Sequence, residues 1–273
     1  MPSQPMVATP ELAHRILNLF ARTNLELVRI QTRQGVAAME VIPIGDGYLF
    51  RNPDYPSRSR VLGFGHDDLP YSELVGQIED LFHEQGLDGQ VYLTPFAKEE
   101  AYRAFGDHGW YPGWWQTALV RPLDANEEYP VLDERIQILS GDEVPIQKWA
   151  ETMAEGFSDF PVLEFDRPET HLAFIETTGR RSCLLLWEGE PAAAANWIVE
   201  GDMGFLANAA TRPAFRRRGL HSALIRFRLK RCAEEGCTFA LYNAETGTNS
   251  QRNAERHGFR VLYTYPTMVK KLT

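Results

Sequence analysis

Several features that would define a protein class are missing from this chain of 273 residues. No run of 18 or more apolar residues occurs, so we expect no membrane span. The first residues, MPSQPMVATPELAH, lack a basic and an apolar region, so we expect no secretory signal. The three cysteines, Cys183, Cys232 and Cys237, have no metal-ligand spacing. We therefore expect reduced thiols, no metal site and a cytoplasmic protein.

Positive charge is scarce in the chain and concentrated in one segment. The 28 Lys and Arg are outnumbered by 37 Asp and Glu, which gives a net charge of -9 and argues against a nucleic-acid binder. Segment 211–231 nevertheless holds eight Arg or Lys and no Asp or Glu. Because 44% of the residues are hydrophobic, the chain is long and apolar enough for one large or two small globular domains.

The two halves of the chain repeat one another in outline. Residues 92–123 and 241–272 each contain a His-Gly-aromatic triplet, followed by the same spacing to a leucine. Each segment comes after an amphipathic helix, expected near 71–85 and 219–235, that a glycine closes. Matched order and spacing favour a duplicated unit.

The boundary between the halves is expected in the polar stretch 124–134, DANEEYPVLDE. We therefore predict an N-terminal domain of residues 1–127 and a C-terminal domain of residues 134–273. In the second half, a helix is expected at 142–156 with Asp142 as its N-cap.

The basic segment has the arrangement of a phosphate site. A strand of small residues, 204–210, is followed by Arg216, Arg217, Arg218, Gly219 and a helix start. The first N–H groups of a helix lack internal partners and carry the positive end of its dipole. Glycine lets the backbone approach an anion, and arginines add forked donors. These residues suit a pyrophosphate; a solvated basic helix after a glycine turn is the alternative interpretation.

The stretch RRRGLH, residues 216–221, resembles motif A of the GNAT superfamily of acyl-coenzyme A-dependent N-acyltransferases. The family pattern is Arg or Gln, two residues, Gly, one residue, then Gly or Ala; here His221 replaces the last small residue. The resemblance covers residues 134–273, and the tail TGTNSQRNAERHGFRVLYT is similar to a tandem branch with a degraded N-terminal copy. It implies an α/β fold of two tandem GNAT-like domains, each a central mixed β-sheet flanked by helices.

The resemblance also implies acetyl-coenzyme A as the co-substrate. Backbone groups of Ala209 and Thr211 would pair with the pantetheine arm, and the N–H groups of residues 217–222 would hold the pyrophosphate. Asn243, Ser250 and Asn253 would face the thioester, although a helix N-cap and a helix-surface amide are equally good interpretations of the last two. The predicted coenzyme-binding residues are Ala209, Ala210, Thr211, Arg216, Arg217, Arg218, Gly219, Leu220, His221, Ser222, Asn243, Ser250 and Asn253.

The first half lacks such a loop. Gly63 and Gly65 precede its helix, but Asp67 and Asp68 would repel a phosphate. We therefore predict one coenzyme site per chain, in the C-terminal half.

Acyl transfer to an amine needs a base for the amine and a donor for the developing oxyanion. Much of the superfamily uses a tyrosine as acid, four residues before the Gly-Phe pair, where this chain has Ala254. Tyr263 or Ser250 are the candidate acids and Glu245 is a candidate base. Core packing for Tyr263 and a solvated carboxylate for Glu245 are the simpler alternatives.

The acceptor is expected to be a small-molecule or protein amine. Loop 156–165 is expected to line its cleft, with Asp159 and Glu164 favouring a cationic amine. The leading hypothesis is an N-acetyltransferase that works by direct transfer in a ternary complex, without nucleic-acid or membrane partners and as a monomer. The alternatives are a non-catalytic coenzyme A sensor and a module that binds a polyanion through segment 211–231.

Overall fold

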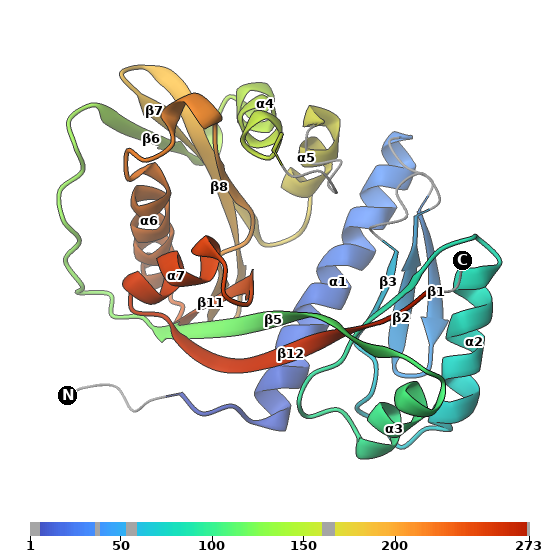
Figure 1. The fold of residues 1–273 in the computed structure, drawn as a ribbon. Helices are drawn as coiled ribbons and strands as arrows, with labels where there is room; N and C mark the ends of the chain where they lie inside the picture. The colour runs from blue at the N-terminus through green and yellow to red at the C-terminus, as the bar shows by residue number, and fades with distance from the viewer. Residues whose placement is uncertain (1–5, 36–38, 53–58, 160–166, 272–273) are drawn as a thin grey trace. The chain divides into compact units, whose positions relative to one another are not determined.

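The computed structural model describes residues 6–35, 39–52, 59–159 and 167–271, and its chain forms two compact units (Figure 1). The N-terminal unit consists of Val7–Thr117 together with Leu262–Thr273, and the C-terminal unit is formed mainly by Ala118–Val261. Each unit therefore contains chain from both sides of the polar stretch 124–134. Glu164, a proposed acceptor-cleft residue, lies outside the described residues.

The N-terminal unit is a mixed sheet covered by helices on both faces. Its strands follow the order β1-β2-β3-β4-β12, antiparallel except for the parallel pair β3–β4. Helix α1 packs through Ala21 and Val28 on one face, whereas α2 and α3 pack on the other. The elements are α1 (Pro10–Gln34), β1 (Glu40–Ile44), β2 (Gly47–Arg51), β3 (Arg60–Leu62), α2 (Tyr71–His83), β4 (Gly89–Tyr92), α3 (Glu99–Asp107) and β5 (Tyr111–Pro122), whose last residues belong to the other unit.

The C-terminal unit repeats this plan. Its strand order is β11-β9-β8-β7-β6, with β10 also paired to β8, and again one parallel pair, β9–β11, is connected through a helix. The elements are β6 (Ile136–Ser140), α4 (Ile146–Gly156), α5 (Pro168–Ile175), β7 (Arg180–Trp187), β8 (Glu190–Glu200), β9 (Met203–Phe205), β10 (Ala209–Thr211), α6 (Leu220–Glu234), β11 (Phe239–Glu245), α7 (Asn249–Arg256) and β12 (Arg260–Lys270), most of which belongs to the N-terminal unit.

Alternating side chains of the central strands bury both faces of the C-terminal sheet. Ala194 packs with residues of α4, whereas its neighbour Ala195 packs with residues of α6. A run of four alanines in β8 lets both helices lie close to the strand, because each Cβ is small. The fold prediction, two tandem units each built on a mixed sheet with flanking helices, is confirmed.

Two local expectations meet different outcomes. Both predicted helix-closing glycines have the left-handed backbone that favours glycine, with φ of 62° at Gly86 and 86° at Gly236. Asp142, however, lies in a short 3-10 turn, and α4 begins only after Pro145, its N-cap. Proline suits a helix start because it has no N–H to leave unpaired. Along the described part of the chain, no helix is both long enough and apolar enough to cross a membrane.

Candidate functional site

A one-residue bulge separates β9 from β10, two consecutive strand segments that both pair with β8. Strand β9 pairs with β8 in a register that joins Phe205 to Ile198, whereas β10 pairs with β8 in a register that joins Ala209 to Ala195. Between these pairs, the three residues 206–208 lie opposite the two residues 196 and 197, which is the signature of a β-bulge. The pairing of β9 with β11 ends at Phe205 and Leu241, and Leu206 N donates to Leu241 O at 2.9 Å. The next paired segment, β10, pairs with β8 and not with β11.

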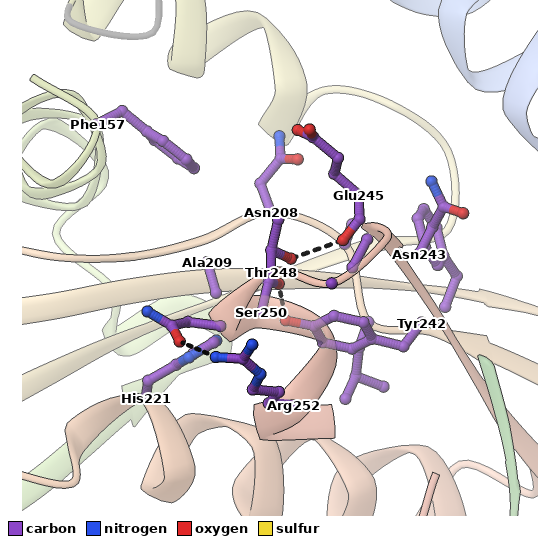
Figure 2. A pocket seen from close by; sticks show the side chains of 16 residues that line it. Phe157, Asn208, Ala209, His221, Tyr242, Asn243, Glu245, Thr248, Ser250 and Arg252 are labelled. Carbon is purple, nitrogen blue, oxygen red and sulfur yellow. Dashed lines mark hydrogen bonds between the residues drawn. The ribbon is translucent and has the colours of Figure 1, made fainter. Parts of the chain in front are cut away.

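A cavity of about 800 Å³ occupies this opening (Figure 2). Asn208, Glu245 and Thr248 lie together on one side of it, and Phe157 lies on the other. The cavity is bounded by the end of α4, the bulge, the end of β11 and the start of α7. Its lining residues are Phe157, Phe205, Leu206, Ala207, Asn208, Ala209, His221, Tyr242, Asn243, Ala244, Glu245, Gly247, Thr248, Asn249, Ser250 and Arg252.

Among the strands of the described residues, only β8 pairs with β10, so one edge of β10 has no strand beside it. Asn196 N donates to Asn208 O at 2.9 Å, and Arg212 N donates to Ala192 O at 3.0 Å. Because residues of an antiparallel strand alternate in direction, the backbone groups of Ala209 and Thr211 face away from β8. The Thr211 carbonyl accepts a hydrogen bond from Arg216 Nε at 3.2 Å. The two residues predicted to bind a pantetheine arm therefore have outward-facing backbone groups.

The turn before α6 presents a set of backbone donors. Gly219, its N-cap, has φ of 75°, and no side chain caps the helix. Arg217 also has a left-handed backbone, with φ of 64°, which is uncommon for a residue with a side chain. Among the described residues, no carbonyl accepts a hydrogen bond from the backbone N–H groups of residues 217–222. The loop therefore offers an anion several unpaired donors at a helix start.

The three arginines of the loop have different surroundings. Arg216 bonds Asp159 and donates from Nη2 to Gly156 O at 3.2 Å, so it ties the loop to the end of α4. Arg218 lies over the rings of Trp187 and Phe215, 5.3 and 5.4 Å from their centroids. Arg217 is exposed. Asp159, which we expected to favour a cationic amine, is thus already engaged by Arg216.

His221 stands where the family pattern has a small residue, and its ring lines the cavity. Its Nδ1 lies 3.2 Å from Asn253 Nδ2, and its Nε2 is buried without a partner in the described structure. Burial, reinforced by the positive charge of Arg228, lowers the pKa of His221 to about 4, so the ring is neutral at pH 7. Asn253 does not itself line the cavity but holds this ring.

A hydroxyl pair lies at the floor of the cavity. Ser250 Oγ, near the start of α7, is 2.9 Å from the Tyr242 hydroxyl, which comes from β11 (Figure 2). Ala254, at the position of the superfamily's tyrosine, is fully buried. Tyr242 was not predicted as a site residue, because it belongs to the apolar run TFALY, a pattern typical of a buried strand.

The other two candidate catalytic residues differ in placement. Glu245 is exposed at the end of β11 and lines the cavity. Tyr263 lies in the N-terminal unit, where its ring packs against Phe96 and Tyr265 at centroid distances of 6.2 and 5.8 Å. It does not line the cavity, and burial raises the pKa of its hydroxyl far above the usual range. The catalytic role of Tyr263 stays a prediction.

The remaining predicted residues frame the site. Asn243 lines the cavity at the end of β11, and Leu220 is buried beneath the loop. Ala210 points to the opposite face and packs with α4. Ser222 contributes its unpaired backbone N–H. Among the described residues, no group of three or more His, Cys, Asp or Glu has an arrangement that could hold a metal ion.

The N-terminal unit has a comparable loop between β3 and α2, but its own carboxylate fills it. Asp46 accepts hydrogen bonds from the backbone N–H groups of Gly65, His66 and Asp67, at 2.9, 2.5 and 2.9 Å. Three backbone donors of this loop are therefore already satisfied by the chain itself. Asp46 comes from the β1–β2 turn, so only the fold brings it to this loop.

In the described part of the chain, the mixed sheet, the cavity beside the bulge and a helix start without a side-chain cap together form a candidate anion-binding site in an α/β protein. Residues 147–259 match the model of the acetyltransferase (GNAT) family. They are therefore a domain of this family, for which N-acyltransferase activity is the general rule. No curated protein matches the chain.

Solved structures share the fold over most of the chain. A GCN5-related N-acetyltransferase from Kribbella flavida aligns with a TM-score of 0.66 at 16% identity, covering 94% of this chain and 95% of that chain. One from Sphaerobacter thermophilus aligns with a TM-score of 0.64 at 17% identity, covering 85% and 82%. A tandem GNAT protein from the clavulanic acid biosynthesis pathway aligns with a TM-score of 0.62 at 11% identity, covering 83% and 78%. At these identities the likeness shows the fold alone.

Proposed function

We propose that this protein is an N-acetyltransferase that moves an acetyl group from acetyl-coenzyme A to a small-molecule or protein amine by direct transfer in a ternary complex. The observation that carries the proposal is that two sets of backbone groups meet at one cavity. Ala209, from the outward-facing edge of β10, and His221, from the turn whose backbone N–H groups have no acceptor among the described residues, both line it.

The residues present fit the coenzyme. A pyrophosphate suits the donors at the start of α6, where Gly219 adds no side chain. An extended amide-bearing arm suits the free edge of β10, in the manner of an added strand. When bound, acetyl-coenzyme A supplies an acyl group activated as a thioester. The comparable loop of the N-terminal unit is filled by Asp46, which supports one site per chain.

The chain's own residues supply the proton transfers. Ser250 holds a proton at Oγ, which it can give to the leaving sulfur and recover from the Tyr242 hydroxyl 2.9 Å away. Glu245 lies at the exposed side of the cavity, where its carboxylate can take the proton of an incoming ammonium, directly or through water. A backbone N–H of the bulge can donate to the acyl oxygen as negative charge develops there.

The first test is calorimetric titration of acetyl-coenzyme A into the wild type and two variants of Gly219. Both Gly219→Ala and Gly219→Asp strain a left-handed position, and an added Cβ meets nothing within 4 Å, so the two variants differ mainly in charge. We expect one molecule bound per chain, moderate weakening in the alanine variant and loss of binding in the aspartate variant. Equal binding by the two variants would show that the loop does not hold the pyrophosphate.

Catalysis is tested separately by thiol release with a panel of polyamines, amino-acid amides and lysine peptides. We expect turnover with at least one amine, and a large fall in kcat for Glu245→Gln at saturating substrate. Ser250→Ala and Tyr242→Phe should each lower kcat with little change in the affinity for acetyl-coenzyme A. A protein that binds the coenzyme yet releases no thiol with any amine would instead be a coenzyme A sensor, a function that the buried Ala254 favours.

A further inference from the structure

A buried arginine connects α6 to the bulge that opens the cavity. Arg228 is fully buried, and its Nε donates to Leu224 O of its own helix at 3.1 Å. Its Nη1 donates to Asn196 O of β8 at 3.1 Å and to Ala207 O of the bulge at 3.0 Å. One guanidinium therefore holds a helix, the strand opposite the bulge and the bulge itself in a fixed arrangement.

The bond to Ala207 also fixes the direction of the next N–H group. In a trans peptide the C=O of one residue and the N–H of the next point in opposite directions. Because the Ala207 carbonyl points at Arg228, the Asn208 N–H points away from it. Among the described residues, no backbone carbonyl accepts from this N–H, and Asn208 lines the cavity.

The charge of Arg228 is not matched by a carboxylate. In the described structure, no acidic side chain forms an ion pair with it, and its Nη2 has no hydrogen-bond partner. A buried guanidinium without a counter-ion is costly, and an apolar side chain of similar size usually packs at lower cost. A charged donor on the Ala207 carbonyl polarises the whole amide, which makes the Asn208 N–H a stronger donor.

We propose that Arg228 is a positioning residue for acyl transfer, which orients and polarises the Ala207–Asn208 peptide so that the Asn208 N–H donates to the acyl oxygen of the bound thioester. This inference rests on the proposed function, since it needs a thioester in the cavity. It assigns a role to the one arginine of the basic segment 211–231 that is fully buried.

The test compares Arg228→Met with Arg228→Lys and with Lys230→Met. The methionine variant removes the charge and both carbonyl contacts, whereas the lysine variant keeps a charge but lacks the forked guanidinium. Lys230→Met removes the same charge from an exposed site on the same helix, 3.9 Å from Glu234. With an amine that supports turnover, we expect kcat to fall at least about tenfold in Arg228→Met, less in Arg228→Lys and not in Lys230→Met, and any rise in KM for acetyl-coenzyme A to be smaller than the fall in kcat.

A second readout does not depend on turnover. Donation to the acyl oxygen predicts that the wild type binds acetyl-coenzyme A more tightly than coenzyme A, and that Arg228→Met loses this preference. A folded Arg228→Met protein with wild-type kcat or an unchanged preference would overturn the inference; if it does not fold, the same results for Arg228→Lys would do so. A wild type that binds neither ligand would overturn the proposed function itself, and the inference with it.

Discussion

Gly156, the last residue of α4, leaves no room for a side chain. A Cβ added there would lie 2.6 Å from Ala210 Cβ and 3.1 Å from Thr211 N, both in β10. Neither atom can rotate away, because one is a methyl fixed to the backbone and the other is backbone. Gly156→Ala should therefore force α4 away from the strand. Overpacking of this kind costs about 1–3 kcal/mol, and the gain in helix propensity offsets only part of it.

The effect should appear in both stability and binding. A net loss of about 1–2 kcal/mol lowers Tm by about 3–8 °C for a domain of this size, measured by calorimetry. Because the Gly156 carbonyl also binds Arg216, and Thr211 lies on the free edge, we expect a Kd for acetyl-coenzyme A about fivefold higher, equal to about 1 kcal/mol.

A matched substitution separates crowding from the change of residue type. Gly106 lies inside α3, and a Cβ there meets nothing within 4 Å, so Gly106→Ala should raise Tm. Removing the opposing methyl in Gly156→Ala/Ala210→Gly should recover part of the lost stability. If Gly156→Ala were as stable as the wild type and bound acetyl-coenzyme A equally well, the close contact of α4 and β10 would not constrain the site.

Three further predictions concern charge. Burial, and next the positive charge of Arg228, lower the pKa of His221 to about 4, so its ring binds a proton more readily in the unfolded chain. The free energy of unfolding that is present above about pH 6.5 should therefore fall on the order of 3 kcal/mol by pH 4. Urea titrations of His221→Asn should show a flatter dependence of stability on pH. Burial raises the pKa of Glu79, but its hydrogen bonds, above all that from Lys270, bring this pKa below the usual value. Glu79→Gln should therefore lower the free energy of unfolding by about 1 kcal/mol at pH 7. The difference in stability between this variant and the wild type should vanish as pH falls below about 4, measured by urea unfolding. Asp46→Ala should destabilise the N-terminal unit by about 2–4 kcal/mol in urea unfolding, because three backbone donors lose their acceptor; a loss under about 0.5 kcal/mol would show that water replaces the carboxylate.

The architecture could largely be predicted from the sequence, because it depends on hydrophobic periodicity and on turn residues. The doubled order of elements, the glycines that end α2 and α6, and the loop ahead of α6 are all local signals. Helix α1 was missed, although Thr9 caps its start and Gly35 ends it. Its polar residues are spread along the whole segment, and its burial becomes clear only once the sheet beside it is known.

The site was only half predictable, since its chemistry depends on contacts between distant segments. Arg228 reads as one more charge in a basic helix, and nothing local shows that it is the buried one. The bulge at residues 206–208 exists because two strand segments pair with β8 in different registers, which no spacing in the sequence specifies. Tyr242 was likewise hidden, because a buried strand and a cavity floor have the same apolar pattern.

Asp46 gives the loop of the N-terminal unit a hydrogen-bond acceptor that belongs to the same chain. A tethered carboxylate is present at a high effective concentration set by the chain, whatever the concentration of free anions outside. Its three hydrogen bonds to the loop therefore form as part of folding. A coenzyme bound at the start of α6 would contact its loop only in the fraction of molecules that the coenzyme concentration saturates. The loop of the N-terminal unit is thus a permanent structural joint, whereas under the proposed function the loop before α6 would be one whose state depends on the coenzyme concentration.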